Sequence, residues 1–124
     1  MHTPLPNRLA EIFAALADPT RLRLLNLIAE REICVCYLVD VLGQPQPKIS
    51  RHLAYLRKTA LVAARREGKW MHYRLCQPAD PASAAILAEV LRALQGDGRM
   101  QLEKAQLERS CCAPQALIMP GGAE

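Results

Sequence analysis

The chain has 124 residues, of which 51% are hydrophobic, so it holds enough apolar material for one globular domain with a single core. It contains no apolar run near the roughly 20 residues that a membrane-spanning helix needs, and it opens without the basic and apolar leader of a secreted protein. A cytoplasmic protein with no membrane partner is therefore expected. The net charge of +4 is compatible with a polyanionic partner but is too small to identify one.

The first third of the chain has the apolar periodicity of two helices. A spacing of i, i+3, i+4 and i+7 predicts a first helix with an apolar stripe of Leu9, Ile12, Phe13 and Leu16. Asp18 and Pro19 end this helix and begin the next, because Asp18 can cap a helix and Pro19 suits its first position. Leu22, Leu25 and Ile28 have the spacing of a second helix.

Residues 35–58 have the pattern of a helix-turn-helix. A short third helix is expected after Glu30-Arg31-Glu32, and Gly43 stands where its C-cap is expected. Its apolar residues at helical spacing are Val35, Leu38, Val39 and Leu42. Residues 44–47 supply the turn, and a fourth helix follows with a buried stripe of Ile49, Leu53 and Leu56. Two short helices joined by a tight turn form this motif.

The pattern changes to strands after the fourth helix. Residues 61–66 and 70–75 flank Glu67-Gly68-Lys69, and the second of these stretches alternates apolar and polar residues. This predicts a β-hairpin, the wing that accompanies many helix-turn-helix motifs. The expected fold class is therefore mainly α with a β-hairpin wing, a winged helix-turn-helix.

A strongly apolar helix is expected after the wing, with one face formed by Ile86, Leu87, Val90, Leu91 and Leu94. A domain this small does not cover that face alone, so we expect a homodimer. Gly96-Asp97-Gly98 interrupts the helix, a polar helix follows over residues 99–109, and residues 114–124 form a loose tail. We expect residues 1–95 to be the DNA-binding and dimerisation domain and residues 96–124 a C-terminal extension with vicinal cysteines.

The fourth helix and the wing carry the side chains expected to contact double-stranded DNA. With its apolar stripe in the core, the opposite face of the fourth helix can enter a major groove, where its first residues reach base edges. The candidates on this helix are Gln46, Lys48, Ser50, Arg51 and His52, although His52 lies toward the core and has an alternative role as a packed histidine. Arg65, Arg66 and Lys69 on the wing are expected to contact phosphates, the alternative being that they are only solvated charges.

Five cysteines are an odd number, and in a reducing cell interior they favour free thiols over a disulfide framework. Cys34 and Cys36 are expected at the start of the third helix, where unpaired N–H groups and the helix dipole favour thiolates. Residues two apart on an ideal helix point about 200° from each other. Both sulfurs would then reach one soft ion only if the first turn unwound, and this would couple ion binding to the DNA-contacting helix.

Four stretches resemble the ArsR/SmtB family of metal-responsive repressors, and specifically its arsenical-resistance branch: residues 14–23, 33–38, 46–53 and 67–75. They occur in the order that the family has. The resemblance implies a homodimer of four helices, a hairpin and a fifth helix, which represses its own operon and leaves operator DNA when metal binds. It also implies arsenite, antimonite or methylarsenite as inducer, with no permanently bound cofactor.

The resemblance further implies the ligands of the inducer. Trivalent arsenic favours three sulfur ligands, and close relatives place the third cysteine where this chain has Val39. The missing ligand could come from Cys111 or Cys112, from Cys76 or from a small cellular thiol. Some members of the family bind trivalent arsenicals with a C-terminal vicinal pair, so Cys111 and Cys112 form either a composite site with the first two cysteines or a second site.

Other interpretations of the same residues stay open. Four thiolates would also suit cadmium or lead, and thiol oxidation could act as the switch instead. Zinc on the fifth helix finds no support, because residues 82–110 contain no histidine. A thiol-dependent oxidoreductase would be expected to show a Cys-x-x-Cys motif or a nucleotide loop, and the sequence has neither, so no enzyme is expected. A DNA-architectural protein without an effector is a third class.

Overall fold

The computed structural model describes residues 3–112, and of Cys112 it describes the backbone alone. The expected tail over residues 114–124 lies outside this range. In chain order the elements are α1 (Leu5–Leu16), α2 (Pro19–Ile28), β1 (Ile33–Cys34), α3 (Val35–Leu42), α4 (Gln46–Lys58), β2 (Val62–Glu67), β3 (Trp70–Leu75), α5 (Pro81–Gln95), α6 (Gly98–Leu107) and the π-helical turn η1 (Glu108–Cys112). No helix within residues 3–112 is long and apolar enough to cross a membrane.

The helix boundaries follow local sequence signals. Asp18 caps α2, because its carboxylate accepts hydrogen bonds from the backbone N–H groups of Thr20 at 2.8 Å and Arg21 at 3.1 Å. Gly43 ends α3 in the left-handed conformation with a φ of 64°, and its N–H donates to the carbonyl of Val39. Both caps confirm the boundaries expected from the sequence.

The core lies between α1, α2, α3, α4 and the sheet. Ile49, Leu53 and Leu56 are fully buried on one side of α4, which confirms the expected stripe. Phe13 belongs to the expected apolar stripe of α1, but its side chain is 54% exposed in the single chain. The buried face of α1 is narrower than the apolar pattern, since it consists of Ile12, Ala15 and Leu16. Phe13 lies one residue, about 100°, around the helix from Ile12.

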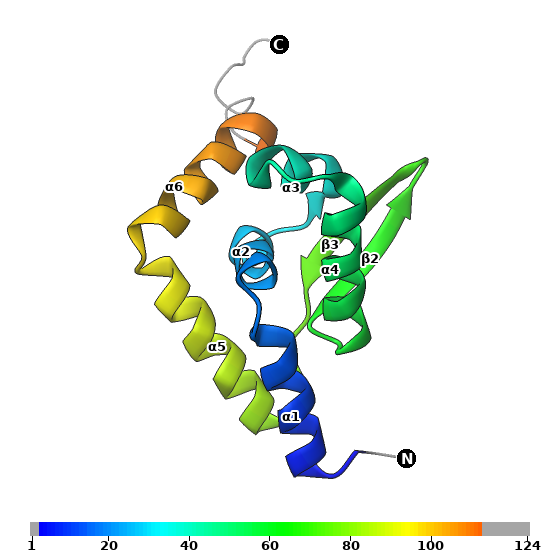
Figure 1. Cartoon of the computed structure of the whole chain (residues 1–124), viewed down its shortest axis with the longest axis vertical. Helices are drawn as coiled ribbons and strands as arrows, with labels where there is room; N and C mark the ends of the chain where they lie inside the picture. Colours follow the sequence, from blue (N-terminus) through cyan, green and yellow to red (C-terminus); the bar gives the residue numbers. More distant parts are fainter. Residues whose placement is uncertain (1–2, 113–124) are drawn as a thin grey trace.

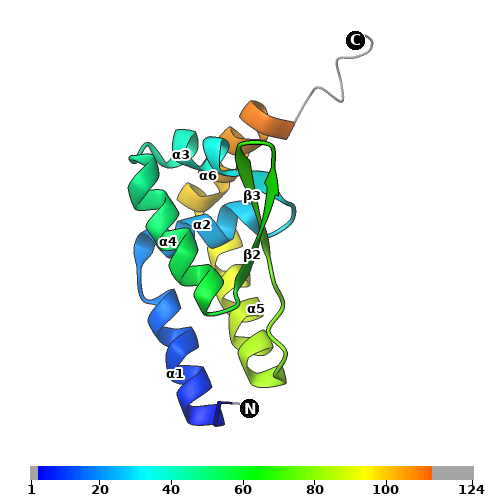
Figure 2. The ribbon, with the colours of Figure 1, turned by 90° about the vertical axis from the view of Figure 1, so that its right-hand side faces the viewer.

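The sheet has three antiparallel strands in the order β1-β3-β2. Strands β2 and β3 form the expected wing, and its turn contains Gly68 with a φ of 63°. The short strand β1 was not expected. It pairs with β3 so that Cys34 lies opposite His72, and on the other side of β3 Arg65 of β2 also lies opposite His72. The wing extends beside α4 (Figure 2).

Helices α5 and α6 form a bent arm along one side of α2 (Figure 1). The bend lies at Gly96-Asp97, where Asp97 caps α6 by accepting from the N–H of Met100. Arg23 of α2 holds α6 in place through Glu103, with Nη2 to Oε2 at 2.7 Å and Nε to both carboxylate oxygens. Nearby, the Asn26 amide donates to the carbonyl of Met100. The polar helix expected after the interruption is therefore packed on the core.

Candidate metal centre and nucleic-acid interface

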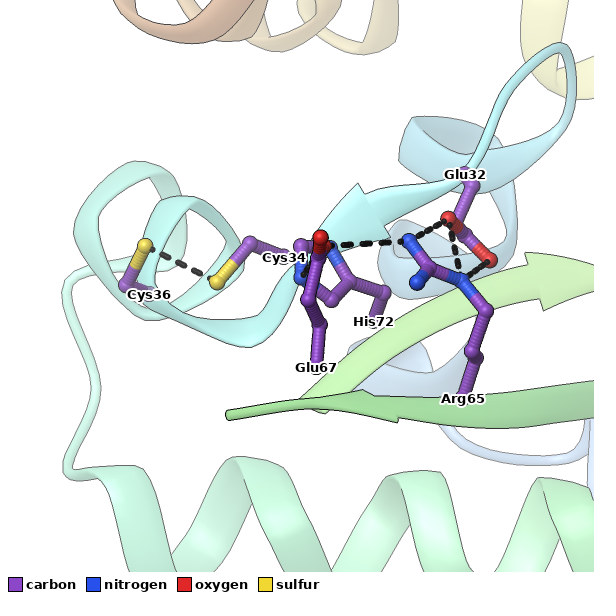
Figure 3. A network of polar contacts seen from close by, with 6 residues as sticks. All are labelled: Glu32, Cys34, Cys36, Arg65, Glu67 and His72. Atoms are coloured by element: carbon purple, nitrogen blue, oxygen red, sulfur yellow. Dashed lines mark hydrogen bonds and ion pairs between the residues drawn. The ribbon is translucent and has the colours of Figure 1, made fainter. Parts of the chain in front are cut away.

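Cys34 and Cys36 present two thiols side by side where β1 passes into α3. Cys34 ends β1 and is the N-cap of α3, with an extended backbone at φ −68° and ψ 142°. The Cys36 thiol donates to the Cys34 sulfur, and the two Sγ atoms are 3.1 Å apart (Figure 3). The expectation that the two side chains diverge was wrong, because the helical rotation of 100° per residue does not apply to an extended Cys34. The sulfurs meet without any unwinding of α3.

The environment of this pair keeps Cys36 protonated. Burial, the hydrogen bond to Cys34 and the nearby Cys34 charge together raise the pKa of Cys36 to about 11. Hydrogen bonds from backbone N–H groups of the first turn lower it by less. The expectation that the helix start favours a Cys36 thiolate was therefore wrong, since desolvation outweighs the helix terminus. A protonated thiol must lose its proton when it becomes a metal ligand.

The structure brings two cysteine sulfurs together, one fewer than the three that trivalent arsenic favours. Within residues 3–112 there is no group of three or more Cys, His, Asp or Glu placed to hold one metal ion. Cys76 is a free thiol just after β3. Cys111 in η1 packs against the edge of the core and is disulfide-bonded, and the side chain of Cys112 lies outside the described part. Any third ligand must come from beyond the first pair.

Helix α4 presents a polar face opposite its buried stripe. The side chains of Gln46, Lys48 and Arg51 are exposed and that of Ser50 is half-buried. The first turn of α4 contains no acidic residue that would repel a phosphate. The structure therefore places four of the five candidate residues of this helix where DNA can reach them.

His52 differs from the other candidates on α4. Its ring Nδ1 is 3.3 Å from Nη1 of Arg21 and 3.9 Å from the Asp18 carboxylate, and its side chain is 17% exposed. Partial burial raises the pKa of Asp18, but backbone hydrogen bonds and the His52 charge outweigh burial and hold it below its usual value. This arrangement favours the packed role, in which His52 joins α4 to the start of α2. Arg21, which the sequence did not single out, completes the junction by stacking 4.1 Å above the Tyr55 ring.

The wing cations are exposed, but they are not equivalent. Nη2 of Arg65 is 2.6 Å from the Glu32 carboxylate, and its Nε donates to both Glu32 oxygens at 3.1 Å. A second carboxylate, that of Glu67, lies 3.4 Å from the same Nη2 and 3.4 Å from Nε2 of His72 (Figure 3). Arg66 has no carboxylate partner within the described range, and Lys69 lies near the Trp70 ring at the turn. Glu32 is a residue that the sequence pattern missed, because its partner is 33 positions away.

A helix-turn-helix whose second helix is exposed and basic, with a β-hairpin beside it, defines a winged helix-turn-helix regulator of transcription. Residues 18–64 match the family described as bacterial regulatory protein, arsR family. The chain is 47% identical over 105 residues to the arsenical resistance operon repressor of Escherichia coli, covering 83% of this chain and 87% of that protein. It therefore belongs to the ArsR family of transcriptional regulators, and it is not an enzyme.

Further relatives and solved structures agree with this assignment. The arsenic resistance transcriptional regulator ArsR1 of Pseudomonas putida is 54% identical over 65 residues, which cover 52% of this chain and 51% of that protein. HlyU from Vibrio cholerae has a TM-score of 0.64 at 26% identity, over 74% of this chain and 97% of that one. A homodimeric winged helix-turn-helix DNA-binding domain from Mycobacterium bovis has a TM-score of 0.60 at 32% identity, over 73% of this chain and 82% of that one.

Proposed function

We propose that this protein is a homodimeric, cytoplasmic repressor of an arsenic or antimony resistance operon, which leaves its operator DNA when trivalent arsenic or antimony binds to Cys34 and Cys36. The observation that carries the proposal is the pair of sulfurs 3.1 Å apart at the junction of β1 and α3. Soft thiol ligands select soft ions, and two adjacent sulfurs can bind one such ion together. The similarity to the Escherichia coli arsenical resistance operon repressor supports the same inducer class.

The bound form would be reached by ligand exchange at the protonated Cys36 thiol. Arsenious acid carries hydroxyl groups, and each new arsenic–sulfur bond replaces one arsenic–oxygen bond. The proton of the thiol leaves with that hydroxyl as water, so the step is balanced without an external base. The raised pKa of Cys36 suits this exchange, because the thiol brings its own proton. Antimonite and methylarsenite carry exchangeable hydroxyls of the same kind.

The third ligand is proposed to come from Cys111 or Cys112, with Cys76 or a small cellular thiol as the alternatives. Cys111 would have to be reduced to take part, because it is disulfide-bonded in this structure. Ser variants separate the arrangements. A composite site predicts weaker release of DNA in both Cys111→Ser and Cys112→Ser. A separate tail site predicts a lower arsenic stoichiometry in these variants, while release through the first pair stays as in the wild type.

The DNA contacts are proposed to come from α4 and the wing. Lys48 and Arg51 project from the exposed face of α4, which would lie in the major groove. Arg66 and Lys69 would contact phosphates beside it. Gln46 and Ser50 share the first turns of the helix and would approach base edges or phosphates.

The dimer interface is proposed to lie on α5, with help from α1. Ile86, Val90, Leu91 and Leu94 are only half-buried in the single chain, whereas Leu87 of the same helix is fully buried. Phe13 adds an exposed aromatic side chain on α1, and α1 lies near α5 (Figure 1). The solved relative from Mycobacterium bovis is described as homodimeric. A second copy of this chain would cover these apolar side chains.

The test is a titration of the reduced protein on fluorescent operator DNA, followed by anisotropy, with arsenite, antimonite, methylarsenite, cadmium or zinc. We expect release by the trivalent arsenic and antimony species and retention with zinc. Release by cadmium alone would replace the proposal with a four-thiolate cadmium or lead sensor. Release by peroxide and recovery with reductant, without a response to arsenite, would replace it with a thiol redox switch. An affinity unchanged under all these conditions would leave a DNA-binding protein without an effector.

A further inference from the structure

Two groups of polar contacts lie close together along β1: the Cys34–Cys36 pair, and the contacts that join Glu32, Arg65, Glu67 and His72. Glu32 stands two residues before Cys34, and its carboxylate holds the guanidinium of Arg65 through both oxygens. Arg65 is on β2, so its side chain reaches past β3 to make this contact. Figure 3 shows the two cysteines, Glu32 and the wing residues around a single short stretch of backbone.

The two groups are connected by the backbone and by the pairing of β1 with β3. Cys34 and Arg65 are the two lateral neighbours of His72, one on each side of β3. Strand β1 has only two residues and passes directly into α3. Only this short strand separates Glu32 from α3, so a shift of Cys34 on ion binding would alter the position of Glu32 relative to β3.

Glu32 and a DNA phosphate would bind the same guanidinium, that of Arg65. Both are anions that bind the guanidinium through paired oxygens, and Arg65 binds one of them well at a time. The contact is open enough to exchange, because the side chain of Arg65 is 51% exposed and that of Glu32 is 28% exposed. Arg65 therefore differs from Arg66 and Lys69. Within the described part of the chain these two cations have no carboxylate partner that they would have to release before binding a phosphate.

We propose that Glu32 competes with DNA phosphate for Arg65, and that this contact transmits occupation of the thiol pair to the wing. In the DNA-bound form Arg65 turns to a phosphate. In the induced form the altered β1 strand maintains the ion pair between Glu32 and Arg65, so the wing has one cation fewer for contact with phosphates. The transmission rests on the proposed function, whereas the competition is a property of the protein without any inducer.

The competition is tested by the operator affinity of reduced full-length protein without arsenic. Glu32→Gln should tighten binding by about two- to fivefold, the range of an exposed ion pair. Glu30→Gln is the matched control. It removes the same charge from the same loop, but the Glu30 carboxylate pairs with Lys104 and not with Arg65. In an Arg65→Ala background, Glu32→Gln should have no effect. Equal tightening by both Gln variants, or tightening that persists without Arg65, would overturn the competition.

The transmission is tested by adding arsenite to the same variants. Arsenite should weaken operator binding of Glu32→Gln by a factor at least twofold smaller than the factor for the wild type. The number of arsenite ions bound per chain should stay the same. Trp70 is the only tryptophan and begins β3, so its emission reports on the wing directly. Arsenite should change this emission in the wild type and less in Glu32→Gln or Arg65→Ala. A full response in both variants would overturn the transmission. If the wild type itself keeps its DNA with arsenite, the transmission falls with the proposed function, and the arsenic-free comparison still decides the competition.

Discussion

The sulfurs of Cys34 and Cys36 lie 3.1 Å apart because Cys34 ends a β-strand while Cys36 stands in the first turn of a helix. The extended backbone at Cys34 removes the rotation that would separate two side chains on one helix. The pair is thus formed before any ion arrives. In the proposed sensor an ion would act on the junction of β1 and α3, and β1 is hydrogen-bonded to the wing.

The protonation of Cys36 predicts how inducer binding depends on pH. Its pKa of about 11 means that the thiol stays protonated until the pH approaches that value. Arsenious acid releases water when it binds a protonated thiol, so its affinity should change little between about pH 6.5 and about pH 8.5. Cadmium must displace the proton into solution, so its affinity should tighten by up to about tenfold per pH unit for each proton released.

Calorimetry in two buffers of different ionisation enthalpy measures these protons directly. The expected result is no net proton release with arsenite and at least one with cadmium. An arsenite affinity that weakens steeply as the pH rises would show that the pair is already ionised, which would contradict the raised pKa of Cys36.

Replacing Arg51 or Lys69 with Ala should change DNA affinity in two different ways. Loss of Arg51, exposed on α4, should weaken operator binding by roughly 1–3 kcal/mol if its guanidinium reaches a base edge. Loss of Lys69 at the wing turn should weaken binding to operator and random DNA alike and reduce the salt dependence. Anisotropy on both DNAs at several salt concentrations separates the two effects. Equal losses on operator and random DNA for Arg51→Ala would remove this residue from sequence recognition.

The proposed dimer predicts two chains in sedimentation at micromolar concentration. Phe13→Asp or Leu94→Asp should raise the dissociation constant of the dimer at least about tenfold. The reason is that each apolar side chain buried in the interface contributes on the order of 1.5–3 kcal/mol to dimer stability. Leu102→Asp is the matched control, because Leu102 is 71% exposed on α6, outside the proposed interface. A monomeric wild type, or an equal effect of the Leu102 variant, would refute this interface.

Glu103 is expected to hold α6 on the core. Its side chain is 10% exposed and binds Arg23 through both oxygens, so Glu103→Ala leaves a largely buried guanidinium without its partner. The free energy of unfolding should fall by about 1–3 kcal/mol, measured by urea denaturation. Glu89→Ala removes an ion pair with Arg92 that is exposed on both sides, and it should leave the unfolding midpoint unchanged. Equal losses in the two variants would show that the Arg23 pair has no special role.

Signals within a few residues of each other predicted most of the elements. Asp18 followed by Pro19 predicts the N-cap of α2, and Gly43 predicts the end of α3. The buried apolar stripe of α4 follows from the spacing of its residues alone. The expected candidates Lys48 and Arg51 are exposed because that stripe fixes the opposite face. These features need no knowledge of distant parts of the chain.

Features that depend on distant partners could not be predicted in this way. A strand of two residues has no periodicity, so β1 becomes visible only when β3, some forty positions later, pairs with it. The close approach of the two sulfurs and the Glu32–Arg65 contact both follow from that pairing. The exposure of Phe13 likewise depends on which face of α1 the rest of the fold covers.

The most direct test of the sensor compares operator release by arsenite in Cys34→Ser, Cys36→Ser and the double variant, followed by anisotropy. Serine has nearly the same size as cysteine but lacks the soft ligand, so repression should persist while release disappears. Cys76→Ser should remain inducible, because Cys76 lies outside the pair; a loss of release in this variant would identify Cys76 as the third ligand. The account predicts that each variant of the pair binds operator with wild-type affinity and keeps it at arsenite concentrations that free the wild type. Release of DNA by the double variant at the wild-type arsenite concentration would contradict it.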